Sequence, residues 1–192
     1  NGPWAGIKRD NYEGGTRVPF MVRWPGVAKP RVTNHPCWQG DFLGTMADYL
    51  EYRLKKNEAP DAESFLPVLE GKKMPKKRRL GFIEHSSSGQ FAFVDYSGEW
   101  KLIDGTGGGG NRKTVDADNN KTLIKGEIRG EPRQLFNLKK DPGERDNLLV
   151  DDPNNPNDDS DPSKKALKKE KELYKSLNII RGDKLWGVDI TK

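Results

Sequence analysis

The stretch GIKRDNYEGGTRVPFMVRWPG, residues 6–26, decides how the first part of this chain folds. Its first half is polar and contains the adjacent glycines Gly14 and Gly15, which are typical of a tight backbone turn. Its second half contains the apolar run 18–24, closed by Pro25-Gly26. Such a run predicts a buried strand that ends in a turn.

Apolar residues recur with helical spacing after this stretch. They fall at i, i+1, i+4, i+7 and i+8 from Phe42, and Asp41 is placed to cap the first turn, so the pattern predicts a helix over about 41–55. We expect four apolar side chains of this region to be buried: Trp24, Phe42, Met46 and Leu50.

The second half of the chain has a different pattern. Short apolar runs separated by Ser and Gly predict antiparallel strands at 80–83, 91–96, 99–103 and 134–138. Residues 151–161 contain three prolines and no apolar residue, which predicts a solvated linker. A helix with one apolar face is expected to begin near Ser163.

Composition indicates that this chain does not build a complete core alone. Hydrophobic residues make up 32% of the chain and charged residues 33%, which is low in apolar content for a self-sufficient α/β domain. The first residue is Asn1 rather than Met, and Asn1-Gly2-Pro3 is typical of a turn. We therefore expect sequence upstream of residue 1.

Charge and cysteine content exclude only a few kinds of partner and site. The formal charge of +5 suits an acidic partner such as nucleic acid, an anionic glycan or a sulfated substrate. Cys37 is the single cysteine, so neither an internal disulfide nor a Cys-based zinc site can form. No run approaches the roughly 18 apolar residues of a membrane span.

Two basic groups could hold an anionic polymer, although solvated surface is the commoner role of such groups. No aromatic residues alternate with them, so nucleic-acid stacking is not predicted. The groups are Lys72, Lys73, Lys76, Lys77, Arg78 and Arg79 in a loop, and Lys164, Lys165, Lys168 and Lys169 in the last helix.

The block from Asn1 to Gly26 resembles one found in type I sulfatases, the formylglycine-dependent enzymes of the alkaline phosphatase-like superfamily. The spacing from Lys8 to Tyr12-Glu13-Gly14-Gly15 matches that block throughout. Three later segments agree in order: Asp41 with Thr45, GEWKLI at 98–103, and LFNLKKDPGERDNL at 135–148.

The resemblance implies a fold and a division into domains. The fold class is α/β: the end of a large mixed sheet followed by a small antiparallel sheet with a C-terminal helix. Residues 1–70 would end the catalytic α/β domain, and residues 71–192 would form the small subdomain. A secreted or periplasmic location is also implied.

The same resemblance assigns site residues and cofactors. Asn1 matches an asparagine that binds a calcium ion, and Lys8 matches the lysine that grips the substrate sulfate, with a catalytic and a substrate-binding role. The formylglycine nucleophile would come from a Cys/Ser-x-Pro-x-Arg motif, and no residues here match it. Cys37 is followed by Trp38-Gln39-Gly40 and is not that cysteine.

These assignments suit the chemistry of a sulfate ester, which needs fixed positive charge as the S–O bond breaks. Calcium prefers oxygen ligands such as an amide carbonyl, and a lysine ammonium is a compact cation suited to one sulfate oxygen. Glu13 is expected to hold the turn or Arg17 rather than to act as a base.

Two other candidates have competing interpretations. His85 could line the substrate pocket or pair with a serine, while a polar turn histidine is the simpler interpretation. A partial calcium-loop pattern has Lys121 where glycine is needed, so a hairpin loop is favoured. Its four matching residues are Asp116, Asp118, Asn120 and Glu127.

The sequence thus predicts the C-terminal portion of a sulfatase that acts on a sulfated small molecule or glycan, with no nucleic-acid or membrane partner. One alternative is a phosphatase or phosphonate hydrolase of the same superfamily. The other is a non-catalytic module that binds anionic glycans through the basic loop.

Overall fold

The computed structural model describes residues 2–75, 79–105, 107–110, 133–149 and 162–182, and the backbone of 184–185 and 188–189. Residue contacts group the chain into two units, one formed by Asn1–Val18 with Gly81–Lys192 and the other by Pro19–Leu80. Residues 1–18 therefore pack with the second half of the chain. A domain division at residue 70 stays a prediction for the whole enzyme.

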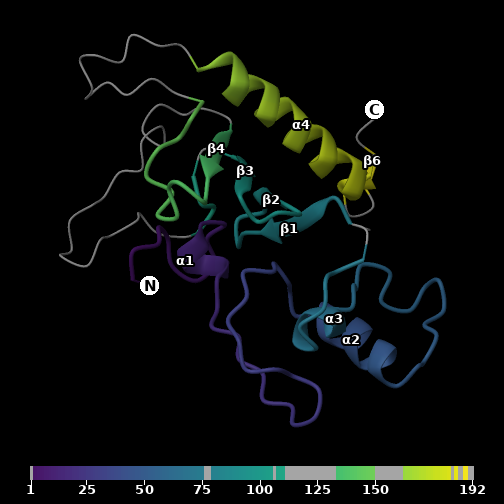
Figure 1. Ribbon diagram of the computed structural model, residues 1–192. Coiled ribbons are helices and arrows are strands. Elements are labelled where there is room, and N and C mark those ends of the chain that lie inside the picture. Colours follow the sequence, from purple (N-terminus) through teal and green to yellow (C-terminus); the bar gives the residue numbers. More distant parts are fainter. Residues whose placement is uncertain are drawn as a thin grey trace. The chain divides into compact units, whose positions relative to one another are not determined.

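The first unit is built on a four-stranded antiparallel sheet with strand order β1-β2-β3-β4 (Figure 1). This confirms the small antiparallel sheet expected from the short apolar runs. The strands are β1 Gly81–His85, β2 Phe91–Asp95, β3 Trp100–Asp104 and β4 Gln134–Asn137.

Both faces of this sheet are covered. Phe93, Leu102 and Leu135 are cross-strand neighbours on one face, where they pack against the long helix α4, Lys164–Arg181 (Figure 1). Side chains alternate along a strand, so the neighbouring residues Ala92, Ile103 and Phe136 point to the other face. There they pack against Ala5 and Tyr12 of the N-terminal block.

Helix α4 begins where the sequence predicts. The Ser163 hydroxyl accepts a hydrogen bond from the Ala166 backbone N–H at 3.1 Å, which caps the first turn. Gly182 follows the last helical residue with a φ of 67°. Beyond it, two-residue strands β5, Lys184–Leu185, and β6, Val188–Asp189, pair antiparallel.

The second unit contains the helices α2, Asp41–Tyr49, and α3, Leu66–Leu69. Helix α2 is shorter than the predicted 41–55, because Leu50 leaves the helical conformation and Glu51 takes a φ of 54°. The predicted capping role of Asp41 is wrong, because Gly40 is the N-cap. The Asp41 carboxylate instead accepts backbone N–H groups of Trp38 and Glu63 and pairs with Arg79.

Two expectations of burial in this unit are wrong. Residues 18–24 form no strand and are mostly exposed, since no strand within the described part of the chain pairs with them. On α2, Phe42 is 58% exposed and Leu50 is 66% exposed, while Trp24 and Met46 are half-buried. The helix buries its opposite side, formed by Asp41, Gly44, Thr45 and Ala47.

Several predicted features lie outside the described residues. They are Asn1, Lys76, Lys77, Arg78, the calcium-loop pattern at 116–127 and the linker at 151–161. Among the helices that the structure does describe, none is long and apolar enough to cross a membrane.

Candidate active-site turn and its buried anchor

The turn that carries Lys8 is held by its own backbone and by Asp10. The Asp10 carboxylate accepts the Ile7 N–H at 2.7 Å, and the Asp10 N–H donates to the Ile7 carbonyl at 3.0 Å. Burial raises the pKa of Asp10, and hydrogen bonds from the backbone of Ile7 and Gly110 oppose that rise. Lys8 is exposed at the tip of the turn, where its ammonium is available to an anion.

Two loops of the sheet contact this turn. The Asn11 N–H donates to the Gly108 carbonyl at 2.7 Å, and the Ser87 N–H donates to the Arg9 carbonyl at 3.1 Å. These loop contacts fix the backbone directly after Lys8. The turn, the β1–β2 connection at 86–90 and the loop at 107–110 therefore form one polar surface.

His85 ends strand β1 directly before the connection that bonds to Arg9. Its exposed ring packs on Phe91, with the ring centres 4.8 Å apart. The neighbouring Ser86 hydroxyl accepts a hydrogen bond from the Gln90 N–H at 3.0 Å, so this hydroxyl is engaged within the turn. A substrate-binding role for His85 stays a prediction.

The glycine pair after this turn is required by close backbone packing. The Gly14 N–H donates to the Ala5 carbonyl at 2.7 Å, and a side chain at Gly14 would overlap the carbonyl oxygens of Ala5 and Gly6. A side chain at Gly15 would overlap those of Ile7 and Asp10. The pair thus lets the short helix α1, Glu13–Thr16, fold back onto the residues that flank Lys8.

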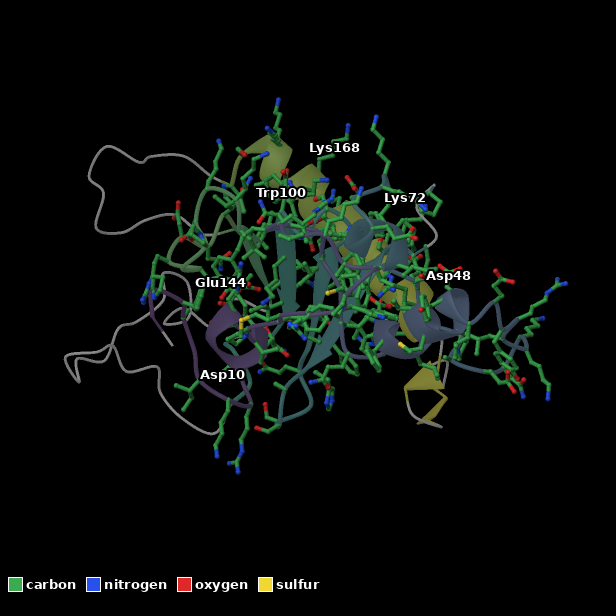
Figure 2. The ribbon with its side chains drawn as sticks, turned by 60° about the horizontal axis from the view of Figure 1, so that its bottom comes forward. Asp10, Asp48, Lys72, Trp100, Glu144 and Lys168 are labelled. Carbon is green, nitrogen blue, oxygen red and sulfur yellow. The ribbon has the colours of Figure 1, made fainter. Side chains whose placement is uncertain are left out.

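Beneath this block lies a buried ammonium surrounded by three carboxylates, which we call the Lys101 cluster. The Lys101 Nζ atom is 2.9 Å from Glu13, 3.0 Å from Glu84 and 3.3 Å from Glu144, and the lysine side chain is fully buried. The four residues come from β3, α1, β1 and the turn after β4. Glu144 lies beside α1 in Figure 2 and accepts the Glu13 N–H at 2.6 Å.

Glu13 has the structural role that the sequence indicates. One of its carboxylate oxygens is 3.2 Å from the Arg17 guanidinium and the other is 2.9 Å from Lys101. Both oxygens are therefore engaged, and the expectation that Glu13 holds the turn or Arg17 is confirmed by the ion pair with Arg17. Tyr12 adds a second tether, since its hydroxyl donates to the Gln134 side chain at 2.7 Å.

The Lys101 cluster has an uneven balance of charge. Burial by itself would lower the pKa of Lys101, but the three carboxylates together raise it above its ordinary value. Burial raises the pKa of Glu84, and raises that of Glu144 to about 7 despite the attraction of Lys101. Lys101 and Arg17 thus face three acids, and protonation of one acid relieves the excess negative charge.

This imbalance predicts a pH dependence of stability. Glu144 holds its proton more tightly in the folded state than its ordinary pKa of 4.5 allows, so folding takes up a proton between about pH 4.5 and 7. The resulting stability is present at low pH and lost as pH rises through about 7. Relative to Glu144→Gln, the wild type should lose up to about 1.4 kcal/mol per pH unit in this range.

The measurement is urea denaturation of both proteins from pH 5 to 7.5. The control is Glu99→Gln, because Glu99 is an exposed carboxylate paired with Lys139. It should shift stability by a similar amount at every pH. A constant difference between wild type and Glu144→Gln across the range would contradict the prediction.

Sequence analysis alone did not identify the Lys101 cluster. The one available signal was a lysine inside the apolar strand pattern WKLI, which needs a buried counter-charge if the strand is central. The expected calcium site also remains without structural support, because Asn1 lies outside the described residues. Within the ranges that the structure describes, no group of three His, Cys, Asp or Glu residues could hold a metal.

The sequence that forms the glycine-paired turn, the small antiparallel sheet and the covering helix is similar to curated sulfatases over most of its length. The N-acetylgalactosamine-6-O-sulfatase of Bacteroides thetaiotaomicron is 30% identical over 153 residues, which are 79% of this chain and 27% of that protein. Human arylsulfatase A is 32% identical over 74% of this chain and 28% of its own length. Mouse steryl-sulfatase is 30% identical over 76% of this chain and 24% of its own length.

The structural comparison agrees with these relatives. A solved structure described in connection with glycosaminoglycan metabolism by Bacteroides thetaiotaomicron matches 94% of this chain and 32% of its own, with 28% identity and a TM-score of 0.65. A comparison with models of known protein families gave no match. The resemblance to sulfatases is confirmed, and the chain spans about a quarter of the length of the curated relatives it matches.

Proposed function

We propose that this chain is the C-terminal portion of a sulfatase, a sulfuric ester hydrolase that acts on aryl or carbohydrate sulfates. The observation that carries the proposal is the Lys8 turn. Its flanking residues are fixed by the Gly14 and Asn11 backbone bonds, while the lysine itself is exposed to an incoming anion. The similarity to sulfatases extends over 79% of this chain in one relative, and one solved structure matches 94% of it.

Lys8 would contribute by binding and orienting the sulfate. An ammonium that contacts one sulfate oxygen offsets negative charge that grows as the S–O bond breaks. Its effect depends on a fixed position, because a flexible cation would reorganise during the reaction. Asp10 makes hydrogen bonds within the turn, and Ser87 and Gly108 are hydrogen-bonded to it from two loops. These bonds limit that movement.

The proposal includes two cofactors, a calcium ion and a formylglycine. This chain would supply only one of the residues involved. We propose that Asn1 would supply an amide oxygen to a calcium ion, a ligand type that calcium prefers. Calcium would add fixed positive charge at the sulfate. The formylglycine nucleophile and the other metal ligands would come from residues outside this sequence, which contains no Cys/Ser-x-Pro-x-Arg motif. By the same resemblance, we propose a secreted or periplasmic protein.

The experiment compares sulfate and phosphate esters as substrates of the full-length enzyme. We expect turnover of an aryl sulfate or of a 6-O-sulfated N-acetylgalactosamine, the substrate in the name of one relative. Turnover should be at least about 100-fold slower on the matched aryl phosphate and phosphonate. A preference for phosphate or phosphonate would favour the other branch of the superfamily. The 192-residue chain alone should show no turnover above buffer.

A further inference from the structure

Helix α4 carries a row of lysines on the side that faces away from the sheet. Its buried residues are spaced at i, i+4, i+7 and i+11, starting from Ala166. A second set with the same spacing, offset by two residues, falls about 200° around the helix and is exposed. We call this set the lysine stripe: Lys164, Lys168, Lys171 and Lys175.

The stripe carries uncompensated positive charge. The acidic residues of α4 are engaged elsewhere, because Glu170 pairs with Arg133 and Glu172 lies 2.9 Å from Lys169. Among the described ion pairs, none involves a lysine of the stripe. The four ammonium groups extend over about 16 Å of helix, and Figure 2 shows Lys168 pointing away from the sheet.

The C-terminal half of the stripe borders an open hollow of about 520 Å³. It is lined by Arg133, Glu170, Lys171, Tyr174, Lys175, Asn178 and Ile179. Arg133 lies over the Tyr174 ring at 3.7 Å and pairs with Glu170, so these two charges offset each other. The hollow therefore combines a largely apolar lining with two lysines that take part in none of the described ion pairs, and its volume suits a small ligand group.

We propose that the lysine stripe and this hollow bind a sulfated polysaccharide, with one sulfated sugar unit in the hollow and the chain along the helix. The proposal rests on the proposed function, in which the substrate is a sulfate ester. A row of cations beside one recess suits a linear polymer that carries repeated sulfates. Single-stranded nucleic acid is less favoured, because the one aromatic ring of the hollow, Tyr174, is covered by Arg133.

The test is binding of a size-defined heparin octasaccharide to the full-length enzyme in about 150 mM NaCl. The variant K164Q/K168Q/K171Q/K175Q removes the stripe, and glutamine keeps the helix propensity. We expect the dissociation constant to rise at least about 10-fold and its dependence on salt to weaken, since fewer counter-ions are released. Turnover of a small aryl sulfate should stay within about 2-fold of wild type.

The matched control is K55Q/K56Q/K139Q/K140Q, which removes the same charge from other exposed positions. It should change octasaccharide binding less than about 3-fold. K72Q/K73Q tests the basic loop in the same assay and should also have a small effect. An equal loss in either of these variants would overturn the proposal.

Two further outcomes would also overturn it: wild-type affinity in the stripe variant, or tighter binding of the enzyme to single-stranded DNA or anionic vesicles than to the octasaccharide. Binding is measured without turnover. An enzyme that hydrolyses no sulfate ester can therefore still pass or fail this test.

Discussion

Replacing Lys101 by methionine is expected to lower the free energy of unfolding by about 3–5 kcal/mol, the usual cost of removing one partner from a buried ion pair. Methionine fills a similar length but has no charge. The variant would leave the carboxylates of Glu13, Glu84 and Glu144 without their shared cation, and Glu144 is fully buried. The expected result is a large fall in the urea midpoint.

Two comparisons make this result specific to the cluster. Lys139→Met removes an exposed ammonium 2.6 Å from Glu99 and should leave the urea midpoint nearly unchanged, because an exposed ion pair contributes little to stability. Adding Glu84→Gln and Glu144→Gln to Lys101→Met should recover part of the loss, because fewer buried charges stay unpaired. A loss below about 1 kcal/mol in Lys101→Met would show that the cluster does not stabilise the fold.

Lys8→Ala in the full-length enzyme should reduce kcat/KM for an aryl sulfate by about 30- to 1000-fold. Loss of one charge-assisted contact to a developing negative charge is worth on the order of 2–4 kcal/mol. Lys8→Arg should recover activity only in part, since a planar guanidinium cannot take the position of a compact ammonium without moving the sulfate. The melting temperature should not change, because Lys8 is exposed and the turn is held by other residues.

Arg9→Ala is the matched control for this experiment. Arg9 is the next residue of the same turn and is also exposed, and its contact with Ser87 uses the backbone carbonyl, which the substitution keeps. It should alter kcat/KM less than about 3-fold. Wild-type kinetics in Lys8→Ala would remove this lysine from the site, and an equal loss in Arg9→Ala would mean that general charge is sufficient.

The parts of the fold that sequence predicted correctly are those set by local patterns. Four strands appear close to their expected bounds, and helix α4 begins near Ser163 as the sequence indicates. Alternating or periodic apolar residues define these elements, and their packing partners lie within the same chain. The prediction failed for 18–24 because a buried strand needs neighbouring strands, and none in the described residues pairs with it.

The candidate site also has one part that local sequence patterns indicate and one part that they do not. Glu13 and Arg17 are four residues apart, so their pairing could be inferred locally, and Lys8 was identified by the resemblance of a short block. The Lys101 cluster could not be inferred, because its residues are spread over more than a hundred positions. Only the assembled sheet places those charges together.

The distances along the chain between these anchors have a consequence for biosynthesis. Glu13 meets Lys101 across 88 residues and Glu144 across 131, and Tyr12 meets Gln134 across 122. The turn with Lys8 is synthesised long before the residues that anchor it. On the ribosome it therefore stays unanchored until β4 and the turn that follows have been synthesised. At typical synthesis rates that delay is on the order of 10 s. A nascent chain that stops before Glu144 would expose an unanchored turn to proteases.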